Sequence, residues 1–136
     1  MTPARLAREA GALLGTRFRL HGRDPATGID CIGLLVAALA RGGHQIIVPT
    51  GYPLRLRELA PWLPDPEACG FAPAREPFRG GDVVMLQPGP AQFHLAIADR
   101  GLGWVHAHAG LRRVVREAVL PSGTVIAHWR LRRIRK

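Results

Sequence analysis

One cysteine at the start of a predicted helix has the setting of a reactive nucleophile. Cys31 follows Asp30 in GIDCIGLLVAALARGG, an apolar stretch over residues 28–43. Asp is a favourable residue immediately before a helix, because its carboxylate accepts a hydrogen bond from a first-turn N–H. In that first turn, unpaired N–H groups and the helix dipole stabilise a thiolate. We therefore expect a lowered pKa for Cys31, although a small buried apolar cysteine would also suit the position.

Three histidines in the second half of the chain can supply the base that a cysteine nucleophile needs. His94 lies in the apolar segment FHLAIAD, and His106 and His108 lie two residues apart in VHAHA. A strand would direct His106 and His108 to the same face. The three imidazoles could instead bind zinc, with Cys31 as a fourth ligand. The sequence offers no nearby carboxylate with an obvious supporting role, so we expect no metal.

The elements that position these residues fall into a helical half and a strand half. Apolar periodicity predicts a helix over residues 3–14, a loop over 15–29, and a buried helix from 30 or 31 to 41. Frequent prolines follow, with a short helix expected at 54–63. Period-two alternation then predicts strands at 82–87, 93–99, 103–109, 112–119 and 124–133. This order indicates an α+β fold, with N-terminal helices packed on a C-terminal antiparallel sheet, in one domain over residues 1–136.

The composition limits the partners and the compartment. The chain has 19 Lys and Arg against 10 Asp and Glu, a net charge of +9, which suggests an acidic partner. Without interleaved aromatics or a recognition-helix pattern, we expect solvated basic faces rather than nucleic-acid binding. No apolar run approaches the ~20 residues that cross a bilayer. The N-terminal segment lacks a small-residue cleavage site, so we expect synthesis in the cytoplasm without a signal peptide and no disulfide between Cys31 and Cys69.

Three segments in order resemble one known family. GTRFRLHGRDPATGIDCIGLL, FRGGDVVML and HLAIADRGLGWVHAHAGLRRVV are similar to the NlpC-type cell-wall cysteine peptidases, which are papain-like enzymes that cut peptidoglycan stem peptides. The shared pattern is a Gly-rich loop, Asp-Cys-x-Gly, Gly-Asp before a strand, and two histidines about one hairpin apart. The segment GRDPATGIDC resembles the branch found in phage tails and gene transfer agents. That likeness implies tail proteins as partners and a chain carried in a phage-like particle to the cell wall.

The resemblance implies a role for each matching residue. Cys31 would be the nucleophile, His94 the general base, and His106 the residue that orients the base. The backbone N–H of Cys31 would contribute to the oxyanion hole, and no cofactor is implied. Phe18 stands where many members of the family carry a tyrosine, so its hydroxyl is missing here. His21 is the nearest polar candidate to replace it.

Three further residues are candidate accessory or substrate-binding positions. Asp30 would cap the helix, and Gly33, which weakens a helix, would let another backbone or a substrate come close. His108 would contact substrate carboxylates or face solvent. The function implied by the resemblance is a cysteine endopeptidase that cleaves the γ-D-glutamyl–diamino acid bond of stem peptides. The alternatives are a non-catalytic or nucleic-acid-binding tail module on a degenerate peptidase fold, and a Cys-His amidase or acyltransferase acting on another substrate.

Overall fold

Two helices form the N-terminal part of the molecule in this computed structural model, which describes residues 1–48, 50, 65–101 and 103–132. Helix α1 spans Pro3–Gly11, and the Thr2 hydroxyl accepts a hydrogen bond from the Arg5 N–H at 3.2 Å. The helix ends three residues before the predicted boundary, because residues 12–15 form turns. Helix α2 spans Cys31–Arg41, as expected. The helix predicted at 54–63 lies outside the described residues.

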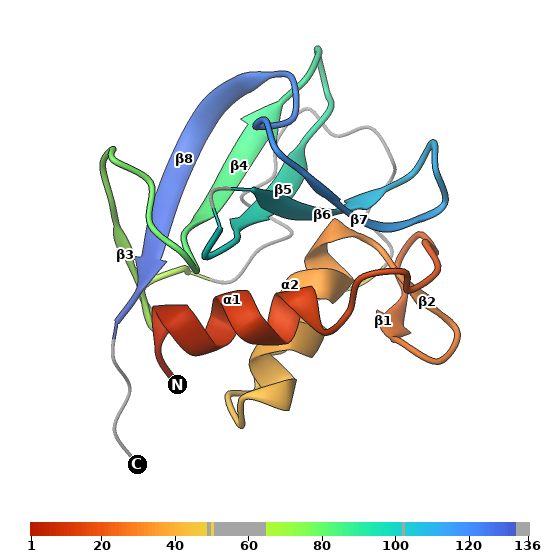
Figure 1. The fold of residues 1–136 in the computed structure, drawn as a ribbon, viewed down its shortest axis with the longest axis horizontal. Coiled ribbons are helices and arrows are strands. Elements are labelled where there is room, and N and C mark those ends of the chain that lie inside the picture. Colours follow the sequence, from red (N-terminus) through yellow and green to blue (C-terminus); the bar gives the residue numbers. More distant parts are fainter. Residues whose placement is uncertain (49, 51–64, 102, 133–136) are drawn as a thin grey trace.

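Six antiparallel strands make the main sheet, in the order β3-β8-β4-β5-β6-β7 (Figure 1). Their bounds are β3 Phe71–Pro73, β4 Val83–Gln87, β5 His94–Ala98, β6 Trp104–His108, β7 Arg113–Glu117 and β8 Thr124–Leu131. The five strands predicted from alternation are therefore present, with shorter ends. β3 was missed, because three residues ending in proline carry no readable alternation. The predicted α+β class, helices on an antiparallel sheet, is confirmed.

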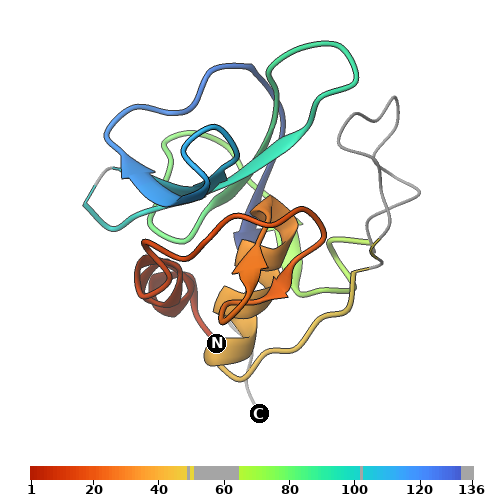
Figure 2. The ribbon, with the colours of Figure 1, turned by 90° about the vertical axis from the view of Figure 1, so that its right-hand side faces the viewer.

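The segment expected as a loop at 15–29 contains a small hairpin. β1 (Arg23–Asp24) and β2 (Gly28–Ile29) form a separate two-strand sheet. Single bridges join Arg17 to Arg113 in β7 and Phe18 to Ile29 in β2. Strands of two residues are too short to show alternation, so the prediction of a plain loop was wrong. The hairpin lies beside the start of α2 in both views (Figures 1 and 2) and fixes the chain that leads into Cys31.

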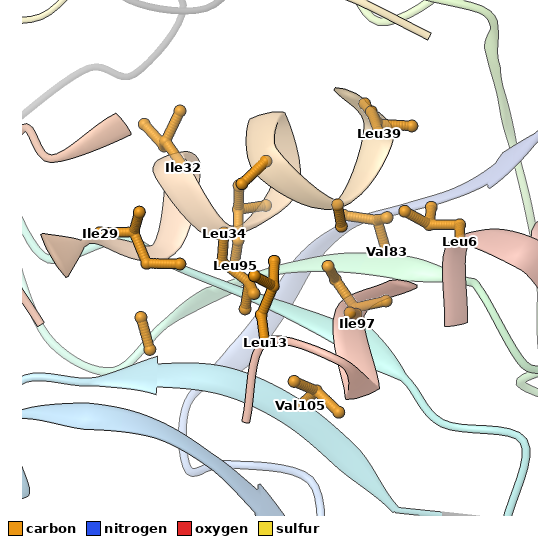
Figure 3. Packing of buried hydrophobic residues seen from close by; sticks show 14 of the residues in the cluster. Leu6, Leu13, Ile29, Ile32, Leu34, Leu39, Val83, Leu95, Ile97 and Val105 are labelled. Atoms are coloured by element: carbon orange, nitrogen blue, oxygen red, sulfur yellow. The ribbon is translucent and has the colours of Figure 1, made fainter. Parts of the chain in front are cut away.

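Both helices cover one face of the sheet and build the main core there. In Figure 3, Leu6 from α1 and Leu13, which follows that helix, lie near Ile97 of the sheet. Leu34 and Leu39 from α2 belong to the same cluster. Alternate sheet residues point to the other face and form a second buried cluster of Val84, Leu86, Ala96, Ala98 and Trp104. By the same alternation, His94 and His106 belong to this second face. Within the described ranges, no helix is long and apolar enough to span a membrane.

Candidate active site

The carboxylate of Asp30 organises the start of α2. One of its oxygens, Oδ1, accepts the Gly33 N–H at 2.8 Å and the Arg23 guanidinium at 3.1 Å, and Oδ2 accepts the His21 N–H at 2.8 Å. Asp30 is only 3% exposed. It thus provides the helix cap that the sequence indicates and also binds the preceding loop to the helix. These bonds set the position of Cys31, the next residue.

Gly33 is required because another backbone lies against it. A side chain at this position would overlap the carbonyl oxygen of Gly22 and come within 3.1 Å of the Ile29 Cβ. Of the two reasons expected for this glycine, close backbone approach or room for substrate, the structure shows the first. The loop around Gly22 therefore packs directly on the first turn of α2.

The thiol of Cys31 lies where α2 meets β5. Its sulfur is close to the backbone N–H groups of Leu95 and Ile32, which favour a thiolate, and Arg23 acts in the same direction. Burial opposes them, and with the negative charge of Asp30 it raises the pKa of Cys31 to about 12. The expectation of a lowered pKa was therefore wrong. The capping carboxylate that makes a good helix start also disfavours a second negative charge beside it.

His94 is the first residue of β5, directly before Leu95. Its Nε2 lies 2.8 Å from Nδ1 of His106, so Nδ1 is the nitrogen of His94 left to face another reactant. Burial, together with the nearby rings of His106 and His108, lowers the pKa of His94 to about 4. The imidazole is consequently neutral at pH 7 and able to accept a proton. His94 is therefore one residue away along β5 from Leu95, whose backbone N–H contacts the Cys31 sulfur.

His106 connects His94 to a carboxylate that the sequence analysis did not select. Its Nε2 lies 2.9 Å from Oε1 of Glu117. His106 is 3% exposed, and burial lowers its pKa although Glu117 acts to raise it. The β6–β7 register pairs Trp104 with Glu117 and His106 with Val115, so Glu117 is the diagonal neighbour of His106 on one face. The alternation in RRVVREAV indicates which face of the strand Glu117 lies on, but only the register between β6 and β7 shows that it lies next to His106.

His108 has a different partner from His106. Its Nδ1 accepts the backbone N–H of Leu111 at 3.0 Å, so in the neutral ring Nε2 carries the proton. The rings of His106 and His108 are 5.6 Å apart and tilted by 43°. The structure therefore separates the two histidines: His106 is bonded to His94, while His108 closes the turn after β6 and keeps one N–H donor for another group.

A groove of about 490 Å³ runs along these side chains. Its lining residues are Pro88, Gln92, His94, His106, His108, Ala109, Gly110, Glu117, Pro121 and Ser122. Cys31 is not among them and approaches β5 from the helix side. Within the described part of the chain, no three His, Cys, Asp or Glu residues are grouped to hold a metal ion. The groove combines imidazole rings, an N–H donor and a carboxylate, so a ligand bound in it would meet several polar groups.

Comparison with solved structures identifies the fold. NlpC2 from Trichomonas vaginalis matches 95% of this chain with a TM-score of 0.67 and 16% identity, although the chain spans only 46% of that protein. The NlpC/p60 domain of the peptidoglycan hydrolase SagA matches 86% of this chain and 89% of its own, with a TM-score of 0.58 and 25% identity. The P60 domain of an antigen from M. avium subspecies paratuberculosis matches 94% of this chain and 93% of its own, with a TM-score of 0.62 and 20% identity. The fold is that of an NlpC/p60 domain. No protein-family model and no curated protein matches the sequence.

Phe18 packs into this NlpC/p60 fold as an apolar residue. It is half-buried against the main core, forms the bridge to Ile29, and donates its backbone N–H to the Arg112 carbonyl at 2.9 Å. His21, the candidate polar replacement, donates its backbone N–H to Asp30 and thereby supports the helix cap. Both residues hold the loop that precedes Cys31.

Cys69 occupies a different part of the NlpC/p60 fold. Both cysteines are free thiols. Cys69 lines an apolar cavity with residues such as Leu35, Phe71 and Trp129, and its carbonyl oxygen bonds to Nε2 of His44 at 2.7 Å. It does not lie at a helix start. Cys69 is therefore a suitable control residue for tests of Cys31.

Proposed function

We propose that this chain is a cysteine endopeptidase that hydrolyses peptidoglycan stem peptides, with Cys31 as nucleophile, His94 as base and His106 as the residue that orients the base. The observation that carries the proposal is the 2.8 Å bond between Nε2 of His94 and Nδ1 of His106. The next residue after His94 is Leu95, whose backbone N–H contacts the Cys31 sulfur. The bond to His106 leaves Nδ1 of His94 as the nitrogen that can accept a proton, and in the proposed reaction that proton comes from the Cys31 thiol.

The reaction follows from these positions. Nδ1 of His94 takes the thiol proton as the Cys31 sulfur attacks the carbonyl carbon of the scissile amide. The oxyanion forms near the first-turn N–H of Cys31, which has no intrahelical acceptor. His94 then gives its proton to the leaving amine, and a thioacyl group remains on Cys31. His94 next takes a proton from water as the water attacks the thioester, and that proton returns to the sulfur when Cys31 is released.

The resting site holds a neutral thiol and a neutral imidazole. The pKa of Cys31 is raised to about 12 and that of His94 is lowered to about 4, so a thiolate–imidazolium pair is disfavoured before substrate binds. Proton transfer then accompanies attack on the carbonyl, and His94 acts as a general base in that step. Bound substrate would also exclude water and supply the carbonyl whose developing charge the helix start stabilises.

The substrate and setting rest on likeness. SagA is a peptidoglycan hydrolase, and the resemblance of residues 15–35 to NlpC-type peptidases implies cleavage of the γ-D-glutamyl–diamino acid bond. The likeness of GRDPATGIDC to the branch in phage tails and gene transfer agents extends the proposal to a particle-borne enzyme that reaches the wall from outside. Detection of the chain in purified particles would test that setting.

Digestion of purified peptidoglycan tests the activity. Wild type, Cys31→Ala and the control Cys69→Ser are incubated with sacculi, and the released fragments are analysed by mass spectrometry. We expect fragments cut between D-glutamate and the diamino acid with wild type and Cys69→Ser, and none with Cys31→Ala. Fragments cut at another amide would support a peptidase that cleaves a different bond from the one proposed. No digestion by any of the three would favour a non-catalytic module.

A further inference from the structure

We propose that Glu117 is a positioning residue that sets the protonated nitrogen of both His106 and His94, and so creates the proton-accepting nitrogen of the base. The inference rests on the proposed function for its catalytic meaning. Its structural basis is a continuous chain across β7, β6 and β5. Glu117 Oε1 is 2.9 Å from His106 Nε2, and His106 Nδ1 is 2.8 Å from His94 Nε2.

The carboxylate of Glu117 determines which atom donates and which accepts in these hydrogen bonds. A carboxylate accepts hydrogen bonds and donates none, so Nε2 of His106 must carry the proton in the bond to Glu117. His106 is buried, and burial lowers its pKa, so its ring is neutral at pH 7 and has only this one N–H. Nδ1 of His106 therefore has a lone pair and acts as an acceptor.

The bond between His106 and His94 has the same donor-to-acceptor direction. Since Nδ1 of His106 accepts, Nε2 of His94 must donate across the 2.8 Å separation. The ring of His94 is also neutral, with a pKa lowered to about 4, so its other nitrogen is unprotonated. Nδ1 of His94 then carries the lone pair that takes the thiol proton. A reversed chain would place a proton on that nitrogen and block the first step.

The surroundings of Glu117 indicate a specific pairing. The neighbouring Arg116 bonds to Asp99 at 2.9 Å, and Glu117 accepts its hydrogen bond from His106 at 2.9 Å. Although the chain has a net charge of +9, this carboxylate, whose side chain is 43% exposed, bonds to a buried imidazole and forms no ion pair with any arginine of the described residues. When His94 becomes an imidazolium, the negative charge of Glu117 also stabilises the new positive charge at the other end of the hydrogen-bonded series.

Substitution by glutamine tests the direction of the chain, because an amide can accept or donate. In Glu117→Gln the side-chain NH₂ can donate to His106, which reverses both bonds and protonates Nδ1 of His94. We expect kcat on a soluble stem peptide to fall about 10- to 100-fold, with KM changed less than about 2-fold. Glu117→Asp should recover part of the loss. Glu9→Gln is the matched control, since Glu9 pairs with Arg5 and Arg41 on the helical side and should leave kcat unchanged.

Imidazole ¹⁵N NMR tests the same inference without substrate. In wild type, both His94 and His106 should be protonated on Nε2 only, and Glu117→Gln should show His94 protonated on Nδ1. Wild-type His94 protonated on Nδ1, or a Glu117→Gln variant with unchanged spectra and unchanged kcat, would overturn the proposal. The outcome is independent of peptidoglycan digestion. A wild type that fails to cut stem peptides removes the proposed function, while the spectra still decide the role of Glu117.

Discussion

Nε2 of His94 lies 2.8 Å from Nδ1 of His106, with the two ring planes at 82° and their centroids 4.9 Å apart. The two residues begin β5 and occupy the middle of β6, and they meet because the strands are adjacent in the sheet. This contact defines which nitrogen of His94 can act as a base. It also distinguishes His106 from His108, which the sequence placed on the same face.

The first prediction concerns the nucleophile. Cys31→Ala should abolish turnover while leaving the melting temperature within about 5 °C of wild type, because the substitution removes a single sulfur atom and keeps the rest of the residue. Steady-state assays and thermal unfolding measure the two effects. Cys69→Ser should remain active, and an inactive Cys69→Ser with an active Cys31→Ala would reverse the assignment.

The second prediction concerns thiol reactivity. The pKa of Cys31 is raised to about 12, so few thiolates are present at neutral pH. In a Cys69→Ser background, alkylation by iodoacetamide at pH 7 should be at least about 100-fold slower than for free cysteine. The rate should still be rising above pH 9. A fast reaction that is already constant near pH 7 would mean that the thiolate–imidazolium pair exists before substrate binds.

The third prediction separates the two histidines of β6. His106→Ala removes the acceptor of the His94 Nε2–H, so kcat should fall by about 100-fold or more with KM little changed. His108 lines the groove with an N–H donor free of the Leu111 bond, so His108→Ala should mainly raise KM. Kinetics on a soluble stem peptide compare the variants. A severe loss of kcat confined to His108→Ala would contradict these roles.

The fourth prediction concerns pH. His94 must be neutral to act as a base, and its pKa is lowered from 6.5 to about 4. The kcat/KM of the enzyme should therefore stay nearly constant from about pH 9 down to about pH 5 and fall only as pH approaches 4. A bell-shaped profile with an acid limb near 6.5 would show that the base has an ordinary pKa.

The same shift affects stability, with a defined sign. Between pH 6.5 and about 4 the unfolded chain binds a proton at His94 that the folded chain does not. The contribution to the free energy of unfolding is therefore complete above pH 6.5 and is lost as pH falls toward 4. Denaturant unfolding of wild type and His94→Ala across this range should show a smaller acid dependence in the variant.

The fifth prediction concerns Gly33, two residues after Cys31. Gly33→Ala would overlap the Gly22 carbonyl oxygen, so the loop must move away from α2. We expect a loss of about 1–3 kcal/mol in the free energy of unfolding, together with lower activity. Gly11→Ala is the control, because a Cβ there meets nothing within 4 Å. That variant should be neutral or slightly more stable, and an equally stable, fully active Gly33→Ala would contradict the argument.

Local sequence determined the elements and the candidate nucleophile and base. The start of α2 at Cys31 could be predicted because Asp30 caps the helix through a bond to Gly33, only three positions away. The five longer strands could be predicted because their alternation is complete within each segment. The 15–29 hairpin could not, since two-residue strands exist only through pairing with each other.

Tertiary structure decided the chemistry of the site. The pKa of Cys31 depends on burial beneath β5 and on the nearby charge of Asp30, so the helix start alone gave the wrong direction. Glu117 enters the site only through the β6–β7 register, which places it diagonally from His106. Propensity and capping act within about one turn of helix or a few strand residues, whereas desolvation and hydrogen bonds between side chains depend on which segments meet. For that reason the residue types of the candidate nucleophile and base could be recognised in the sequence, whereas the fold determines their protonation states.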